Sequence, residues 1–204
     1  MSNMRSLLKT CVCLVVLLAS SSFSQPIPGT IDSASALQHS REAAKKLLTT
    51  MRTLLSQQLA AGGAVRAIDV CADSAQVVGE RLQEQLGVSI RRVSMKWRNP
   101  KNIPDAFESA ELKRFAELKN AKALSDTSEF FQIVTEKDGR ALRYMRPIII
   151  GDMCLSCHGS REKMKDLIYS SIQQRYPNDK AVDYKAGELR GAVSVKMPLD
   201  GQKR

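Results

Sequence analysis

Leucine, alanine and methionine residues recur three or four positions apart over the thirty residues that begin at Asp32. This spacing places them along one face of an α-helix, with polar side chains on the opposite face. The run ends at Gly62-Gly63, and a glycine pair favours helix termination because it leaves the backbone unrestrained. The pattern therefore predicts a long amphipathic helix over residues 32–61.

The rest of the chain predicts shorter elements. Asp105 and Glu108 form a helix-capping pair, and Asp138-Gly139 is a hairpin signal. The predicted elements are an apolar piece over 64–71, a helix over 73–86, a strand over 88–93, an ordered loop over 96–104, a helix from Asp105, strands over 130–134 and 141–144, an extended segment over 147–150, a helix over 162–176 and a strand over 191–197. Helices before and after a small antiparallel sheet favour the α+β class over a parallel α/β fold.

The amino terminus has the layout of a secretory signal peptide. Arg5 and Lys9 precede an apolar run over residues 11–19, and small residues follow it. The run is too short to span a membrane stably, although an uncleaved anchor is the alternative. We therefore expect residues 1–24 to be removed on export to the periplasm. Residues 25–204 should then form one soluble domain without a transmembrane segment.

The chain is basic, with 31 Lys and Arg residues against 21 Asp and Glu residues and a formal charge of +10. Loss of Arg5 and Lys9 with the signal peptide leaves +8. Such a surface suits an acidic protein partner or anionic headgroups, or it is a solvated face with no dedicated partner. An exported chain is remote from nucleic acid, so we expect no nucleic-acid partner.

Cys154-Leu155-Ser156-Cys157-His158 matches the pattern for attachment of a c-type haem. Two residues between the cysteines let both sulfurs reach the vinyl groups of one porphyrin, and the adjacent histidine can bind the iron. The chain is only 5% aromatic, and a buried porphyrin would add apolar area that aromatic residues do not supply. The motif predicts one covalent haem c.

Three other interpretations of the two cysteines stay open. A redox-active dithiol is one, although thioredoxin-like sites need a βαβ setting that these elements do not provide. A zinc site is another, but its further ligands would have to be Cys71 and His39, which lie far away in sequence. The third is a structural disulfide, which would leave Cys71 as an odd cysteine.

Five segments in order resemble the PAS-like c-type haem domains known as the Tll-like haem domain, long filed as a domain of unknown function. The resemblance covers most of the chain after the signal peptide. It implies a PAS-like antiparallel sheet flanked by helices, with a long amphipathic helix first. The segments are Ala67-Ile68-Asp69-Val70-Cys71, Arg91-Arg92-Val93-Ser94 with Trp97 to Asn102, Tyr144-Met145-Arg146-Pro147, Cys154 to Gly159, and Gly187-Glu188-Leu189-Arg190-Gly191.

The resemblance also implies His158 and Cys71 as axial ligands of the haem iron. The composition agrees, because Cys71 is the cysteine left to bind as a thiolate once Cys154 and Cys157 form thioethers. An ordinary buried thiol is the alternative for Cys71. His39 and several methionines are rival ligands, although His39 should face solvent. These methionines are Met95, Met145, Met153, Met164 and Met197.

The anionic haem propionates need polar or cationic partners. The candidates flank the predicted loop or stand close to the cysteine motif. They are Arg91, Arg92, Arg98, Asn99 and Arg146. Each residue alone is more typical of a charged surface, so they are proposed here as a group.

With two histidines in the chain, and His158 assigned to iron, no Ser-His-Asp constellation is possible. We therefore expect a protein that is not an enzyme.

A thiolate ligand lowers the reduction potential of the iron, which argues against a general high-potential electron carrier. The sequence favours a haem-based redox or gas sensor that binds a diatomic gas when reduced. A low-potential electron-transfer protein is the alternative. The partner would be a redox or signalling protein, and the long helix could pack against its copy in a homodimer.

Overall fold

The computed structural model describes residues 31–125 and 127–200, except for the side chains of residues 70, 71 and 73–76. The predicted signal peptide lies outside this part of the chain. Within the described residues, no helix is both long and apolar enough to cross a membrane.

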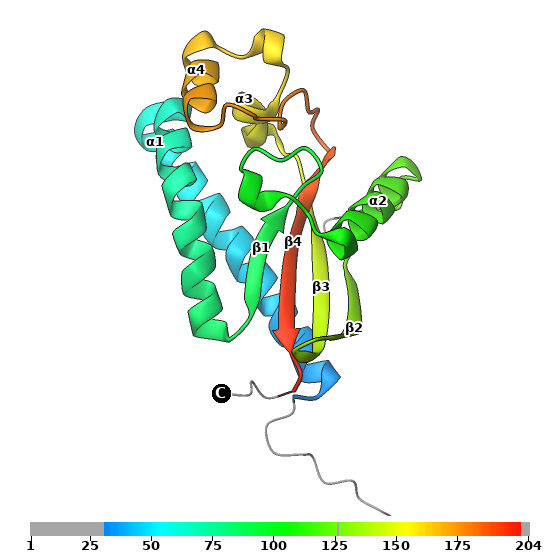
Figure 1. Cartoon of the computed structure of the whole chain (residues 1–204). Coiled ribbons are helices and arrows are strands. Elements are labelled where there is room, and N and C mark those ends of the chain that lie inside the picture. Colours follow the sequence, from blue (N-terminus) through cyan, green and yellow to red (C-terminus); the bar gives the residue numbers. More distant parts are fainter. Residues whose placement is uncertain (1–30, 126, 201–204) are drawn as a thin grey trace, which may run out of the picture.

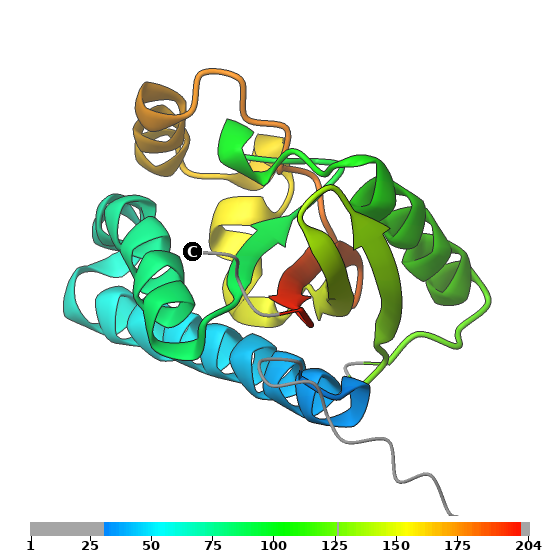
Figure 2. The same ribbon diagram turned by 60° about the horizontal axis from the view of Figure 1, so that its bottom comes forward.

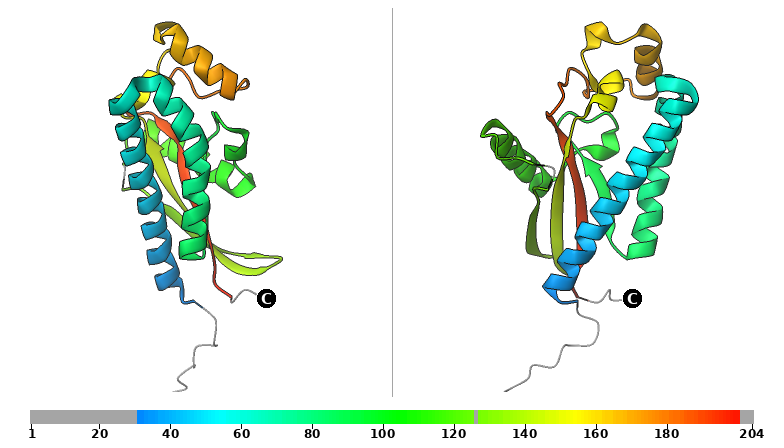
Figure 3. Two further views of the ribbon diagram at one scale, coloured as in Figure 1. Left: turned by 90° about the vertical axis from the view of Figure 1, so that its left-hand side faces the viewer. Right: turned by 180° about the vertical axis from the view of Figure 1, so that it is seen from behind.

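Helix α1 (Ser33–Leu86) folds back on itself at the glycine pair, so that two antiparallel arms lie side by side (Figures 1 and 3). The Asp32 side chain caps its start by accepting hydrogen bonds from the backbone N–H groups of Ala34 and Ser35. Gly63 has a φ of +71°, which a residue with a side chain rarely adopts. The predicted end of the first helix is confirmed. We name residues 33–61 the first arm and residues 64–86 the second arm.

The prediction of a separate apolar piece over 64–71 and a helix over 73–86 is wrong, because the second arm is helical throughout. Ala67 and Ile68 of that segment are buried, at 1% and 7% exposure. The apolar segment is too short to show a helical spacing of its own in the sequence. Its packing in the tertiary structure stabilises it as part of the helix.

The sheet has four antiparallel strands in the order β1-β4-β3-β2. Their bounds are Ser89–Val93 for β1, Phe130–Glu136 for β2, Gly139–Ile149 for β3 and Leu189–Pro198 for β4. The predicted pair of strands over 130–134 and 141–144 is confirmed, but β3 is longer and runs through Pro147. Beyond Met145, strand β3 pairs with β4 and no longer with β2. Proline has no backbone N–H to donate, and Pro147 is tolerated here because one side of the strand has no partner strand among the described residues.

Each face of the sheet is covered by a different helix (Figure 2). On one face, the first arm packs Leu47 against Tyr144 and Val195. On the other face, α2 (Ala106–Asn120) packs Phe115 against Met145. Tyr144 and Met145 are neighbours in β3, so the alternation of side chains along a strand divides the apolar residues between two cores.

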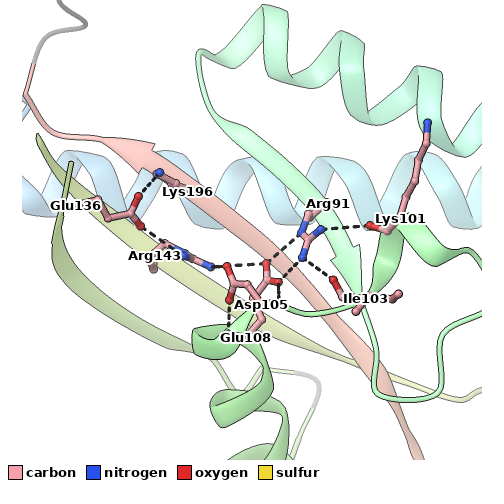
Figure 4. Close-up of polar contacts among 8 residues, drawn as sticks. All are labelled: Arg91, Lys101, Ile103, Asp105, Glu108, Glu136, Arg143 and Lys196. Atoms are coloured by element: carbon pink, nitrogen blue, oxygen red, sulfur yellow. Dashed lines mark hydrogen bonds and ion pairs between the residues drawn. The ribbon is translucent and has the colours of Figure 1, made fainter. Parts of the chain in front are cut away.

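Helix α2 is joined to the sheet by a partly buried polar network (Figure 4). Asp105 and Glu108 form the predicted capping box, and Glu108 is only 2% exposed. Glu108 also pairs with Arg91, while Arg143 reaches Asp105 at 2.6 Å and Glu136 at 3.5 Å. Carboxylates and guanidinium groups thus neutralise one another across the β1, β3 and α2 junction, with Glu108 and Arg143 as the buried members.

The Arg143→Gln variant should unfold with a free energy about 1 kcal/mol lower than wild type at pH 7. It removes the side-chain cation that contacts Asp105, while Glu108 keeps its pair with Arg91 and Glu136 keeps its pair with Lys196. Although burial acts in the opposite direction, hydrogen bonds from Glu108 and Arg143 lower the pKa of Asp105. A hydrogen bond from Lys196 lowers the pKa of Glu136. The stability these groups supply is present above the usual carboxyl pKa of about 4 and is lost as the pH falls through the lowered values.

Urea unfolding measured between pH 3 and pH 7 tests this prediction. Wild type should lose stability steeply below about pH 4, and Arg143→Gln should lose it less steeply. Arg114→Gln is the control, because Arg114 is 58% exposed and stands 4.0 Å from Glu111. Equal stability of Arg143→Gln and Arg114→Gln at pH 7 would contradict the prediction.

The segment after β3 forms two 3₁₀ turns and two short α-helices near the bend of α1 (Figure 1). These are 3₁₀ turn η2 (Asp152–Cys154), α3 (Leu155–His158), 3₁₀ turn η3 (Arg161–Lys163) and α4 (Asp166–Arg175). The predicted continuous helix over 162–176 is therefore too long. Met164 adopts an extended backbone between η3 and α4 and packs with Ile68 and Ile172. The free energy gained by burying the Met164 side chain is therefore larger than that of continuing the helix through this residue.

Candidate functional site

The cysteine motif lies at the end of the sheet where three strands meet. Strands β1 and β3 end there and antiparallel β4 begins there, with Val93 opposite Ala192 and Ile149 opposite Leu189. The chain leaves β3 and enters η2 and α3 within a few residues. The sheet therefore places the motif beside the two arms of α1.

A cavity of about 340 Å³ opens between these elements. Its wall is largely apolar on the side of α1 and β3 and carries the cysteine motif on the other side. The α1 and β3 residues include Leu48, Met51, Leu55, Ala67, Ile68, Ile148 and Ile149, and Ile150 follows directly after β3. The motif contributes Cys154, Cys157 and His158. Apolar walls with a few convergent polar groups are typical of a cofactor site.

A second cavity, of about 320 Å³, adjoins the first and is more polar. The two cavities share Ile68, Arg92, Arg98, Asn102, His158 and Arg190. The shared residues make the two cavities the apolar and polar parts of one site.

Cys154 and Cys157 are free thiols on one short turn of backbone. Burial raises the pKa of the Cys157 thiol, and the nearby Arg98 guanidinium opposes this effect. Both cysteines border the apolar cavity, and the structure contains no disulfide between them. Their sulfurs are thus available to a ligand in that cavity.

The His158 ring is held by a hydrogen bond between its Nδ1 atom and the Ala181 carbonyl oxygen, at 2.7 Å. A carbonyl only accepts, so Nδ1 carries the proton and Nε2 is the unprotonated nitrogen of the neutral ring. Burial lowers the pKa of His158 well below its usual value, and Arg98 and Arg190 lower it further. A neutral imidazole with a fixed tautomer is the form that binds a metal ion.

Three arginines border both cavities: Arg92, Arg98 and Arg190. Arg190 donates hydrogen bonds to the Ser94 hydroxyl at 2.8 Å and to the Lys96 carbonyl at 3.0 Å, and burial lowers its pKa. The buried Nε of Arg98 has no hydrogen-bond partner among the described residues. Close positive charges of this kind favour an anionic ligand.

The other predicted polar residues lie differently. Arg91 borders the polar cavity, but its guanidinium binds Glu108 and the Ile103 carbonyl, because neighbouring residues in β1 point to opposite faces. Asn99 also borders the polar cavity, and its side chain accepts from the Lys101 backbone N–H. Arg146 borders neither cavity and lies near Glu129, so the structure does not place it in the predicted group.

Cys71 lies in the second arm, and its side chain is outside the described residues. Among the rival sulfur ligands, only Met153 borders a cavity. Met145 and Met197 are buried in the two sheet cores, while Met95 is 52% exposed. His39 is exposed, as expected.

Met51 and Arg190 are among the cavity residues that sequence reasoning did not assign to the site. Met51 was part of the helical apolar pattern, which gave no reason to separate a cavity residue from a core residue. Arg190 entered only as part of a family segment, although its position just before Gly191 at the start of β4 was a usable signal.

The zinc alternative, which needs Cys71, stays untested, because the Cys71 side chain is outside the described residues. Within the part of the chain that the structure describes, no three His, Cys, Asp or Glu side chains gather in a way that could hold a metal ion. His158 contacts Tyr184 edge-on, with ring centroids 6.3 Å apart, rather than another metal-binding residue.

The family model for Tll0287-like proteins matches residues 32–198 of the chain. The chain belongs to the Tll0287-like family. A comparison with curated proteins finds no match. Among solved structures, the crystal structure of the cyanobacterial haem protein Tll0287 is similar, with 26% sequence identity and a TM-score of 0.57 over 83% of this chain and 96% of that chain.

Membership of the Tll0287-like family confirms the resemblance predicted from the five sequence segments. The structural match also confirms the predicted α+β fold with a long first helix. The match spans both arms of α1, the sheet and the motif, because residues 32–198 contain all of them.

Proposed function

We propose that this Tll0287-like protein binds one haem, attached covalently through Cys154 and Cys157, with His158 as an axial ligand to the iron. The observation that carries the proposal is the cysteine motif in the wall of the apolar cavity, beside a neutral, oriented imidazole. The similar solved structure is of a haem protein, which supports the same cofactor here.

The residues of the site fit a haem in three respects. The apolar wall formed by α1 and β3 suits a porphyrin, and both cysteines are free to form thioethers. The carboxylates of the propionates would satisfy the unpartnered Nε of Arg98, with Arg92 and Arg190 beside it. Each part of the cofactor thus meets residues of matching chemistry.

When bound, haem supplies a one-electron iron centre that can also take a diatomic gas. His158 offers Nε2 because Ala181 holds the proton on Nδ1. The second ligand in this proposal is Cys71. Its position supports the assignment, because it follows Ile68 and Ala67 of the cavity wall by three and four positions in the same helical arm.

The role we propose is that of an exported redox or gas sensor rather than an enzyme or a general electron carrier. In a haem-loaded protein of this kind, Cys71 would hold the cofactor less strongly in the reduced state, which carries one positive charge fewer. Release of the Cys71 side chain would free the second arm from the cofactor. Export by the sequence of residues 1–24 would place the protein in the periplasm, where its basic surface suits an acidic redox or signalling partner.

Carbon monoxide titration distinguishes a sensor from a carrier. The reduced protein should bind carbon monoxide and change its absorption spectrum, because a weakly held Cys71 side chain would give way to the gas. The oxidised protein should not bind the gas. Absorption spectra of both oxidation states, recorded during the titration, measure the result.

The Cys71→Ala variant serves as the comparison in the same titration. Its oxidised spectrum should already differ from that of wild type, while the haem stays covalently attached. A reduced wild-type protein that refuses carbon monoxide and exchanges electrons rapidly would instead identify an electron carrier. An unchanged oxidised spectrum in Cys71→Ala would remove Cys71 from the ligand set.

A further inference from the structure

A buried ion pair between Asp179 and Arg98 lies behind the His158 ring. Asp179 Oδ2 is 3.0 Å from Arg98 Nη2, and the side chains are 0% and 13% exposed. Burying two charges is costly and does not by itself stabilise a fold. The groups that this ion pair contacts indicate why the two charges are buried here.

The pair contacts the residues that hold the imidazole. Arg98 Nη2 donates to the Cys157 carbonyl at 2.6 Å and to the Ala181 carbonyl at 3.3 Å. Asp179 Oδ1 accepts from the Ala181 backbone N–H at 2.8 Å. Both backbone groups of Ala181 are thus fixed by the pair, and the Ala181 carbonyl is the acceptor for His158 Nδ1.

We propose that Asp179 and Arg98 are positioning residues for His158, which fix its hydrogen-bond acceptor and balance the charge beside its ring. This inference rests on the proposed function, in which His158 binds the haem iron. Residues behind a metal-binding histidine set its orientation and its strength as a ligand. Asp179 was not among the site residues predicted from the sequence.

The sign of the effect follows from charge. The iron centre carries one more positive charge when oxidised than when reduced. The Asp179→Asn variant keeps the shape but removes one negative charge from beside Arg98. The more positive surroundings disfavour the oxidised state and raise the reduction potential. The Arg98→Gln variant leaves a buried carboxylate, which favours the oxidised state and lowers the potential.

The hydrogen bond acts in the same direction. In wild type, the Ala181 carbonyl is shared between Arg98 and His158. Without the guanidinium, the carbonyl accepts more strongly from Nδ1, and the ring gains negative character that stabilises oxidised iron. Arg98→Gln should therefore lower the potential through both routes.

Spectroelectrochemical titration of the haem-loaded protein tests the proposal. The expected result is a positive shift of the midpoint potential in Asp179→Asn and a negative shift in Arg98→Gln. The matched control is Asp200→Asn, because Asp200 pairs with Arg140 at 2.8 Å at the start of β3, the end of that strand remote from the motif. It should leave the midpoint unchanged.

Shifts in the same direction, or no shift, would overturn the proposal, because mere loosening of the fold affects both variants alike. Arg98→Lys provides a test that does not depend on Asp179. It keeps the cation, so its midpoint should stay nearer to wild type than that of Arg98→Gln, and an equal shift would also overturn the proposal. A wild-type protein that releases haem into acid would instead refute the proposed function itself.

Discussion

Replacing Cys154 and Cys157 together by alanine should convert a protein that keeps its haem in acid acetone into one that releases nearly all of it. The thioether bonds are covalent and survive denaturation, whereas a bond from His158 to iron breaks when acid protonates the imidazole. The experiment uses protein exported in cells that mature c-type cytochromes. The haem fraction left on the chain is measured by haem staining after denaturing electrophoresis.

The single variants and a third cysteine supply the controls for this prediction. Cys154→Ala and Cys157→Ala should each keep haem through the remaining thioether. Cys71→Ala should keep it fully, because in our proposal Cys71 binds iron and not the porphyrin edge. Release of haem from matured wild-type protein would contradict covalent attachment.

Gly191→Ala should lower the free energy of unfolding by about 3 kcal/mol. A Cβ at Gly191 would stand 2.2 Å from the Val93 carbonyl oxygen and 3.0 Å from Ser94 Cβ, and the glycine φ is +157°. The Val93 carbonyl cannot retreat without disturbing the pairing of β1 with β4, because Val93 pairs with Ala192. Strain there should also deform the apolar cavity, whose wall includes Val93, Ser94 and Gly191.

Thermal and urea unfolding measure this loss, with Gly151→Ala as the matched control. Gly151 also borders the apolar cavity, but a Cβ there meets nothing within 4 Å. The control should stay within about 0.5 kcal/mol of wild type. A stable Gly191→Ala protein would mean that β1 and β4 can separate at this point at little cost.

The chemistry-bearing motif could be predicted from sequence because its residues are contiguous. Cys154, Cys157 and His158 lie within five positions, and their spacing matches the pattern for attachment of a c-type haem. The end of the first arm at Gly62-Gly63 was predictable for the same reason, since backbone freedom is a local property of glycine. The ordered family segments were recognisable because they too are short.

Longer-range packing decided which neighbouring residues belong to the site. Arg91 and Arg92 are adjacent and alike, yet Arg91 binds Glu108 while Arg92 borders both cavities. The alternation of a strand separates them, but only the placement of α1 and α2 decides which face carries the site. The sequence shows that side chains alternate between the two faces of a strand, but it does not show which face will carry the site.

The sequence by itself determined the strands, the first helical arm, the cysteine motif and the family. Tertiary structure alone brought Arg190 and Asp179 to His158, from segments that follow it in the chain by 32 and 21 positions. Their positions depend on the antiparallel return of β4 and on the loop before it, which places Ala181 against the imidazole. Contacts of that kind form only when distant segments pack, so no local period or spacing could predict them.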